Sequence, residues 1–408
     1  MKSSANYVTR VFKSWSDIHT TTWNTLLAEQ SEPTPFMRWE YLNALQTSDS
    51  ATPATGWDLR IVTLWSNETQ QADLVAACPL YIKPHSYGEY VFDFAWANAY
   101  AQHGLDYYPK AVVAVPFTPV PGSRLLAKDD ASRAALVLAC KALCDVESLS
   151  SLHLLFTAKA DLAAAQGLMP RLATQFHWAN TTSPLTSQLF SDFEDFLTTL
   201  THEKRKKIRQ ERRKVASAGV VFRHSEGIAI SAADWDFFYT CYERTYLEHG
   251  NAPYLSRDFF RSMARDMPEN WLLFVGEMDG QPIATSLLAI QTQKDSSGVV
   301  KKIAYGRYWG ATVRVDCLHF EACYYQPIAW CIDNGYARFE GGAQGEHKMA
   351  RALMPVTATS LHHIAHPQFA KAIERFLERE AAGMASYHDD LDKRSPLKKA
   401  TTDPLISQ

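Results

Sequence analysis

The chain has 408 residues, of which 46% are hydrophobic and 21% are charged. This length exceeds one ordinary hydrophobic core, so it predicts two domains of roughly 150–200 residues each. The net charge of −3 argues against a strong overall attraction to nucleic acid or to an anionic membrane.

Neither the cysteines nor the histidines predict a metal site. Seven cysteines are spread along the chain without a Cys-x-x-Cys pair, which also argues against a disulfide framework. His362, His363 and His366 lie close together, but no His-Glu-x-x-His motif or carboxylate pattern accompanies them. The N-terminus does not resemble a signal peptide, and no apolar run approaches the ~18 residues of a membrane span. We therefore expect a cytoplasmic protein with no membrane span.

The first half of the chain alternates between strand and helix patterns. Amphipathic spacing predicts helices over residues 15–29, 36–45, 95–105, 129–146 and 159–166. Alternation of apolar and polar residues predicts strands over residues 58–65, 72–83, 90–94, 111–115 and 152–157.

A charged link precedes a second half with a similar order of elements. In the link we expect helices over residues 190–200 and 202–216, the second ended by Gly219. Strands are then predicted over residues 220–223, 271–293 (a hairpin that turns at Asp279-Gly280), 303–310, 336–340 and 360–364. Further helices are predicted over residues 234–249, 256–266, 317–333 and 367–391. These patterns predict an α/β protein with mixed sheets.

Residues 303–348 hold the densest set of groups that bind substrates or move protons. These are Arg307, Tyr308, His319, Glu321, Tyr324, Tyr325, Gln344, Glu346, His347 and Lys348. An inert core has little use for so many polar side chains near two strand ends and one helix, so this stretch is the predicted active site.

The glycine-rich segment 341–345 places two candidate bases directly after a turn. The segment does not match the phosphate-binding Gly-x-x-x-x-Gly-Lys-[Ser/Thr] pattern, because His347 and Met349 interrupt it. His347 titrates near neutrality, and Glu346 would act as a base if burial raised its pKa. The alternative is a turn that carries solvent-facing polar residues.

Glu321 precedes Tyr324 and Tyr325 by one helical turn, so these three side chains are expected on one face. His319 lies at the start of the same helix, where the helix dipole favours an anion. The alternative is a buried tyrosine pair with Glu321 as its hydrogen-bond partner.

Two further clusters carry charge or aromatic rings. Residues 204–214 contain eight lysines and arginines against one acid, Glu211, which indicates either a polyanion site or a solvated helix face. The other cluster lies in the first half and comprises His85, Tyr87, Glu89, Tyr108 and Lys110. It is predicted either to contact a substrate or to cap the sheet.

The order of hairpin, strand, helix and strand over residues 271–340 resembles the central part of GNAT-fold acyltransferases. Residues 204–221 resemble the basic entry to the second domain of FemAB-type proteins, and the segments His-Phe-Glu-Ala-Cys-Tyr-Tyr-Gln and Gly-Gly-Ala-Gln-Gly-Glu-His-Lys strengthen this similarity. The resemblance covers nearly the whole chain and implies two tandem GNAT-like domains. The expected boundaries are 1–183 for the first domain, 184–218 for the link, 219–391 for the acyltransferase domain and 392–408 for a flexible tail.

The resemblance implies N-acyl transfer to an amine held in a cleft that the first domain bounds. For this reaction we expect His347 or Glu346 as the base and Tyr308, Tyr324 or Tyr325 as the polarising or proton-returning group. Glu321 is expected among the catalytic residues. Substrate contacts are expected from Arg307, His319, Tyr325, Gln344, Lys348, His85, Tyr87, Glu89, Tyr108 and Lys110. Strands 282–291 and 300–310 are expected to splay apart and present backbone amides to the donor.

The sequence does not identify the acyl donor. The GNAT pyrophosphate loop is absent, because this chain reads Gly-Ala-Thr-Val-Arg-Val-Asp at the corresponding place. An acyl-CoA, an aminoacyl-tRNA or a carrier-bound acyl group is therefore expected as co-substrate, with no tightly bound cofactor. The donor phosphates are expected to contact Lys204, Arg205, Lys207, Arg209 and Arg314. The alternative function is a non-catalytic module that binds RNA or a cell-wall precursor.

Overall fold

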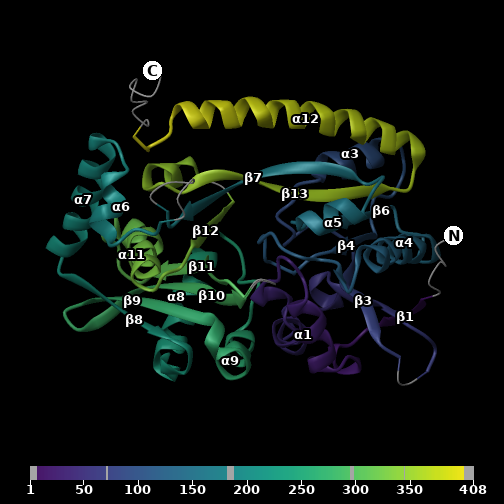
Figure 1. The fold of residues 1–408 in the computed structure, drawn as a ribbon, viewed down its shortest axis with the longest axis horizontal. Coiled ribbons are helices and arrows are strands. Elements are labelled where there is room, and N and C mark those ends of the chain that lie inside the picture. Colours follow the sequence, from purple (N-terminus) through teal and green to yellow (C-terminus); the bar gives the residue numbers. More distant parts are fainter. Residues whose placement is uncertain (1–6, 70–71, 182–187, 295–297, 344, 399–408) are drawn as a thin grey trace, which may run out of the picture. The chain divides into compact units, whose positions relative to one another are not determined.

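The computed structural model describes residues 7–69, 72–181, 188–294, 298–343 and 345–398. The chain forms two compact units (Figure 1). Unit 1 comprises residues 1–174, 252–270 and 357–386, and unit 2 comprises residues 175–251, 271–356 and 387–408. Both units are discontinuous in sequence, whereas the predicted domains are contiguous, because residues 252–270 and 357–386 pack with the first part of the chain.

Unit 1 contains a mixed sheet in the order β1-β2-β3-β4-β6-β13. Its strands are β1 (Val8–Phe12), β2 (Asp58–Trp65), β3 (Leu74–Lys83), β4 (Lys110–Val113), β6 (Ser151–Leu154) and β13 (Met354–Ile364), and β5 (Leu126–Ala127) pairs with β3. Neighbouring strands are antiparallel except β4 and β6, which are parallel. The helices that begin in this unit are α1 (Thr20–Ala28), α2 (Trp39–Thr47), α3 (Phe94–Gln102), α4 (Asp130–Val146), α5 (Lys159–Ala164), α9 (Arg257–Asp266) and α12 (Pro367–Lys393).

Helix α4 shows why the prediction from periodicity works in this unit. Asp129 caps it by accepting a hydrogen bond from the Ser132 amide. Its buried side chains include Leu136, Cys140 and Cys144, which recur every four residues and pack on the sheet core. The strand predicted over residues 90–94 is wrong, because these residues precede and begin α3.

Unit 2 contains the sheet segment β7-β12-β11-β10-β9-β8. Its strands are β7 (Met169–Ala179), β8 (Val220–Glu226), β9 (Trp271–Met278), β10 (Gln281–Lys294), β11 (Val300–Ala311) and β12 (Arg338–Ala343). The helices are α6 (Phe193–Thr198), α7 (His202–Ser217), α8 (Ala232–Glu248), α10 (Leu318–Phe320) and α11 (Gln326–Asp333). The strands alternate with helices as predicted, and both units confirm the α/β class.

The helix predicted over residues 317–333 is interrupted by a π-helical turn, Glu321–Tyr325, between α10 and α11. Pro327 follows this turn and accounts for it, since a proline lacks the N–H of the helical hydrogen bond and its ring displaces the carbonyl four residues earlier. The backbone N–H of Gln326 instead donates a hydrogen bond to the backbone carbonyl of Glu321, five residues earlier. The wider turn changes the directions of the side chains from Glu321 to Tyr325.

Within the described parts of the chain, none of the helices combines the length and the apolar composition that are needed to cross a bilayer.

Candidate functional site

The strands that diverge in unit 2 are β11 and β12. We expected the divergence between strands 282–291 and 300–310, but that expectation is wrong: β10 and β11 pair antiparallel from Ala284↔Ala311 to Lys294↔Val300. In contrast, the parallel pairing of β11 with β12 in the described residues covers only Ile303–Tyr305 against Arg338–Glu340. The physical reason lies in the connections, because β9, β10 and β11 follow one another as antiparallel neighbours, whereas a helical crossover joins β11 to β12.

A bulge in β11 coincides with this divergence. The register of β11 against β10 shifts between Leu287↔Tyr308 and Leu288↔Gly306, which leaves Arg307 as the extra residue. A bulge bends a strand and increases its local twist. The bend therefore explains why β11 leaves β12 after Tyr305 and continues for six more residues to Ala311.

Five aromatic and imidazole rings gather where the two strands part. Trp309 comes from β11, His319 and Phe320 from α10, Tyr324 from the π-helical turn, and His347 from the 3-10 turn Glu346–Arg351 that follows β12. The centroid of the His319 ring lies 5.1 Å from that of Trp309, 5.6 Å from that of Tyr324 and 6.3 Å from that of His347. We call these five residues the ring cluster. It brings together the predicted site residues His319, Tyr324 and His347.

His347 is the exposed member of the ring cluster that can take up a proton. Its Nε2 lies 3.2 Å from the Tyr324 hydroxyl. Partial burial, then the charges of Arg351 and Lys348, lower the pKa of His347 below its usual 6.5. Burial raises the pKa of the Tyr324 phenol. At neutral pH a neutral imidazole therefore faces a protonated phenol.

The second histidine of the ring cluster, His319, is half-buried and neutral. Burial, followed by the charges of His347, Arg351 and Lys348, lowers the pKa of His319 to about 4. This side chain contacts Trp309 and Phe320 through its ring, so it forms an uncharged wall of the site.

A buried ion pair that the sequence did not predict fixes the His347 backbone. The Arg351 guanidinium donates through Nη1 to the His347 carbonyl at 2.7 Å and through Nη2 to the Glu211 carboxylate at 2.7 Å. The Tyr325 hydroxyl donates to the same oxygen of Glu211. The guanidinium carbon also lies 3.5 Å from the centroid of the Phe320 ring. The sequence contained one indication of this pair: Glu211 is the single acidic residue among the eight lysines and arginines of residues 204–214.

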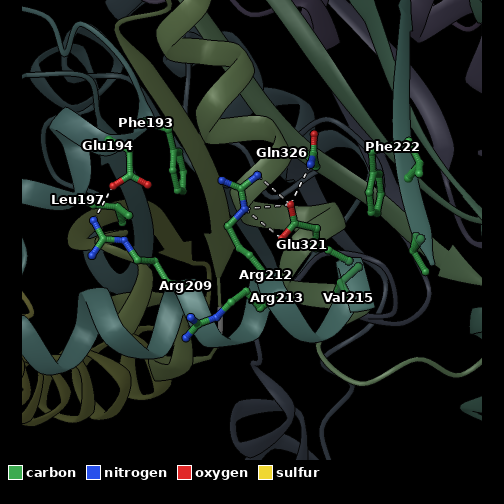
Figure 2. A pocket seen from close by; sticks show the side chains of 13 residues that line it. Phe193, Glu194, Leu197, Arg209, Arg212, Arg213, Val215, Phe222, Glu321 and Gln326 are labelled. Carbon is green, nitrogen blue, oxygen red and sulfur yellow. Dashed lines mark hydrogen bonds and ion pairs between the residues drawn. The ribbon is translucent and has the colours of Figure 1, made fainter. Parts of the chain in front are cut away.

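Glu321 points towards Arg212 of α7 and Gln326 (Figure 2) and is not a member of the ring cluster. Its carboxylate accepts hydrogen bonds from Arg212, whose Nη2 is 3.1 Å away, and from the Gln326 amide at 2.8 Å. It has no contact with His347 among the described interactions. Glu321 and Tyr325 therefore both face α7, through Arg212 and Glu211, while Tyr324 faces His347.

Two residues near the glycine turn have partners that oppose their predicted roles. Glu346 is exposed and pairs with Arg394 at 2.7 Å, so the burial that its role as a base required is absent. The Lys348 ammonium donates to the carbonyls of Gly341 at 2.6 Å and Ala343 at 2.9 Å. Burial lowers the pKa of Lys348 to about 8. Lys348 thus holds the glycine turn, and Gln344 lies outside the described residues.

Tyr308 and its neighbour Trp309 lie on opposite faces of β11, so Tyr308 is separated from the ring cluster. Its ring packs against Tyr242 of α8, with centroids 5.2 Å apart, while the next residue, Trp309, faces His319. Arg307, the bulge residue, donates from Nη2 to the Tyr308 hydroxyl at 3.1 Å. The geometry therefore favours a structural role for Tyr308 over the predicted catalytic one.

The predicted phosphate-binding residues lie along α7 and the loop that precedes α10. Lys204 is 3.8 Å from Glu203, and Arg209 is 2.5 Å from Glu194. In the described residues, Arg205, Lys207 and Arg314 have no ion-pair partner. Ile208, Glu211 and Val215 form the buried face of α7, so its free cations lie towards solvent.

The predicted cluster in unit 1 is largely a buried network. The Lys110 ammonium is fully buried, bonds Glu89 and Ser86 at 2.8 Å each, and also pairs with Asp93. Tyr108 bonds the same Ser86 hydroxyl at 2.8 Å. Glu89 and Lys110 are therefore occupied with each other and inaccessible, because a buried charge requires a partner. His85 and Tyr87 lie nearer the surface, with ring centroids 5.2 Å apart, and Tyr87 is exposed.

No group of three or more His, Cys, Asp or Glu side chains is arranged to hold a metal ion in the part of the chain that the structure describes.

Comparison with known proteins gives one family and several structures of similar fold. A search of the curated proteins gives no match. The chain is similar to L-PGS from Bacillus licheniformis, with 9% identity over 87% of this chain and 95% of that one and a TM-score of 0.48. It is similar to the C-terminal domain of a putative lysylphosphatidylglycerol synthetase from Agrobacterium fabrum, with 9% identity over 89% and 95% and a TM-score of 0.46. A tandem GNAT protein from the clavulanic acid biosynthesis pathway has 11% identity over 89% and 99% and a TM-score of 0.44.

The family comparison covers almost the entire chain. The model of the FemAB-like family, which is described as peptidoglycan biosynthesis/recognition, matches residues 14–399. The protein therefore belongs to the FemAB-like family, which confirms the predicted relationship and its assignment as a transferase of acyl or aminoacyl groups.

Proposed function

We propose that unit 2 transfers an acyl or aminoacyl group to an amine at the ring cluster, with His347 as the base. The observation that carries this proposal is the neutral, exposed imidazole of His347 at the point where β11 and β12 part. Its ring contacts Tyr324 and its backbone is anchored by Arg351. A base must be both unprotonated at the working pH and fixed in place, and His347 meets both requirements.

The reaction follows from these groups. The acceptor nitrogen attacks the carbonyl carbon of the donor, a C–N bond forms, and the C–S or C–O bond to the leaving group breaks. His347 takes the proton that the nitrogen loses and returns it to the leaving thiol or hydroxyl. Tyr324, which stays protonated, orients the imidazole through its hydroxyl. Backbone amides of β11 beyond Tyr305 supply the hydrogen bonds that the oxyanion requires.

We propose a phosphate-bearing donor, an acyl-CoA or an aminoacyl-tRNA, and an amine of a peptidoglycan precursor as the acceptor. The cations that lack ion-pair partners in the described residues and lie outside the lining of any cavity discussed below, Arg205, Lys207 and Arg314, support the donor class, since phosphates bind such groups. The family description supports the acceptor class. Because these donors occur in the cytoplasm, we place the reaction there.

Mass spectrometry of reaction mixtures tests the proposal. Wild-type protein is incubated with acyl-CoAs or charged tRNA and an amine-bearing precursor, and the product is the acceptor with the mass of one acyl group added. His347→Ala is expected to lower the rate by about 10²–10⁴-fold, the contribution of a positioned base. His249→Ala, an exposed histidine of unit 2 outside the ring cluster, is the matched control.

Two results would contradict the proposal. Equal rates for His347→Ala and the control would remove His347 as the base. Salt-sensitive binding of the donor without a product from any donor would identify a non-catalytic binding module instead.

A further inference from the structure

A cavity of unit 2 lies beside the π-helical turn and is lined by α6, α7, β8 and α11 (Figure 2). Its volume is about 590 Å³, within the ~300–1,000 Å³ of pockets that hold small molecules. Figure 2 shows Phe193 and Phe222 on opposite sides of the Arg212–Glu321 pair, with α7 running along one side. We call this cavity the α7 pocket.

Apolar side chains form much of the lining of the α7 pocket. Leu197, Val215 and Val220 contribute aliphatic surface, and Phe193 and Phe222 contribute rings. The Arg212 guanidinium lies over the Phe193 ring, 4.6 Å from its centroid. This surface suits an apolar ligand body, because binding removes such groups from water.

The charged groups of the α7 pocket leave an excess of one cation. Arg209, Arg212 and Arg213 line it together with two carboxylates, Glu194 and Glu321. Arg209 pairs with Glu194 and Arg212 with Glu321. Arg213 has no ion-pair partner among the residues that the structure describes. One negative charge on a ligand would therefore balance the lining.

The α7 pocket is separate from the ring cluster. None of Trp309, His319, Phe320, Tyr324 and His347 belongs to its lining. Its nearest connection is Glu321, which begins the π-helical turn that also carries Tyr324. The acyl-transfer site therefore does not account for this cavity.

We infer that the α7 pocket binds an apolar molecule that carries a single carboxylate or phosphate group. The apolar body lies against Val215, Val220 and Phe222, and the anionic group pairs with Arg213. This inference is independent of the role of His347, since it concerns a different cavity and is tested by binding alone.

Calorimetry on the full-length protein tests the inference with decanoate and decyl phosphate, each below its micelle concentration. We expect saturable binding of one molecule per chain for at least one of them, and the tighter of the two identifies the natural head group. Decanol is expected to bind at least about tenfold more weakly, since a hydrogen bond to a charged group contributes more than this factor.

Three variants locate the binding. Arg213→Gln is expected to weaken binding of the anionic ligand about fivefold to tenfold, and its affinity should approach that of decanol. Ala216→Phe fills the pocket from an exposed position of α7 and is expected to abolish binding without a change in the melting temperature. Lys206→Gln removes a cation of the same helix that does not line the pocket and is expected to leave the affinity unchanged.

The inference is overturned if neither decanoate nor decyl phosphate binds saturably, or if Ala216→Phe binds as well as the wild type. An equal loss in Lys206→Gln and Arg213→Gln would also overturn it, because it would indicate a general attraction to α7.

Discussion

The buried ion pair of Arg351 and Glu211 offers the most direct test of how the site is held together. Their side chains are 3% and 9% exposed and lie 2.7 Å apart. Replacing Arg351 by methionine keeps much of the apolar volume but leaves the Glu211 carboxylate buried, with the Tyr325 hydroxyl as its one remaining side-chain donor among the residues that the structure describes. Breaking one side of a buried pair costs about 3–5 kcal/mol of unfolding free energy, so Arg351→Met is expected to destabilise unit 2 by this amount.

The double-mutant cycle with Glu211→Gln separates the pair from its surroundings. The double variant has no unpaired buried charge, so its cost is expected to fall below the sum of the single costs by about 2–3 kcal/mol. Urea unfolding, followed by hydrogen–deuterium exchange of peptides from β9 and β10, reports the stability of unit 2 specifically. Activity should fall in Arg351→Met even where the protein stays folded, because the His347 carbonyl loses its donor.

Arg394→Met provides the matched control. Arg394 also pairs with a glutamate at 2.7 Å, but those side chains are 56% and 47% exposed, and exposed pairs contribute only about 0.2–1 kcal/mol. If Arg351→Met costs no more than Arg394→Met, and the cycle shows no coupling beyond error, then the buried network does not hold His347 in place.

Three further predictions concern chemistry, donor binding and packing. Because the pKa of His347 is lowered, kcat/KM should stay level as the pH falls to 6.5 and decline only below it as the imidazole protonates; a decline centred above pH 6.5 would contradict the assignment. The double variant of Arg205→Gln and Lys207→Gln should raise KM for a phosphate-bearing donor and reduce its salt dependence while kcat stays within about twofold, and an unchanged KM would remove these α7 cations from donor binding. Gly310→Ala places a Cβ 2.1 Å from a backbone carbonyl of α8 and should cost at least about 1–3 kcal/mol in urea unfolding. Gly383→Ala, within α12 and with no atom near its Cβ, should instead stabilise the protein by about 0.5–1 kcal/mol. Equal changes in the free energy of unfolding for the two variants would contradict the close approach of Gly310 to α8.

The sequence determined the elements whose signal is local. The strand predicted over residues 58–65 coincides with β2, and the helices predicted over 129–146 and 202–216 differ from α4 and α7 by one residue. Amphipathic spacing, caps and terminal glycines act within one or two turns, so they can be read along the chain. The density of polar residues over 303–348 likewise singled out His319, Tyr324 and His347, which the fold brings together.

Tertiary structure alone decided which of these polar residues share a site. Arg351 and Glu211 are 140 residues apart in sequence, and no periodicity connects them. The bulge at Arg307 and the π-helical turn before Pro327 rotate side chains away from the faces that ideal strand and helix geometry assigns. Glu346, Lys348 and Glu321 resemble catalytic groups in sequence, but each has a structural partner. Glu346 pairs with Arg394, Lys348 donates to carbonyls of the glycine turn, and Glu321 pairs with Arg212.

The same distinction applies to the buried charges of unit 1. The sequence left open whether Glu89 and Lys110 contact a substrate or cap the sheet, whereas the fold buries them against each other with Asp93. Whether a charged side chain meets water, a substrate or an opposite charge depends on segments that are distant in sequence. A chain specifies its local conformation through neighbouring residues, whereas the environment that sets the pKa and the partner of each polar group exists only once distant segments have packed together.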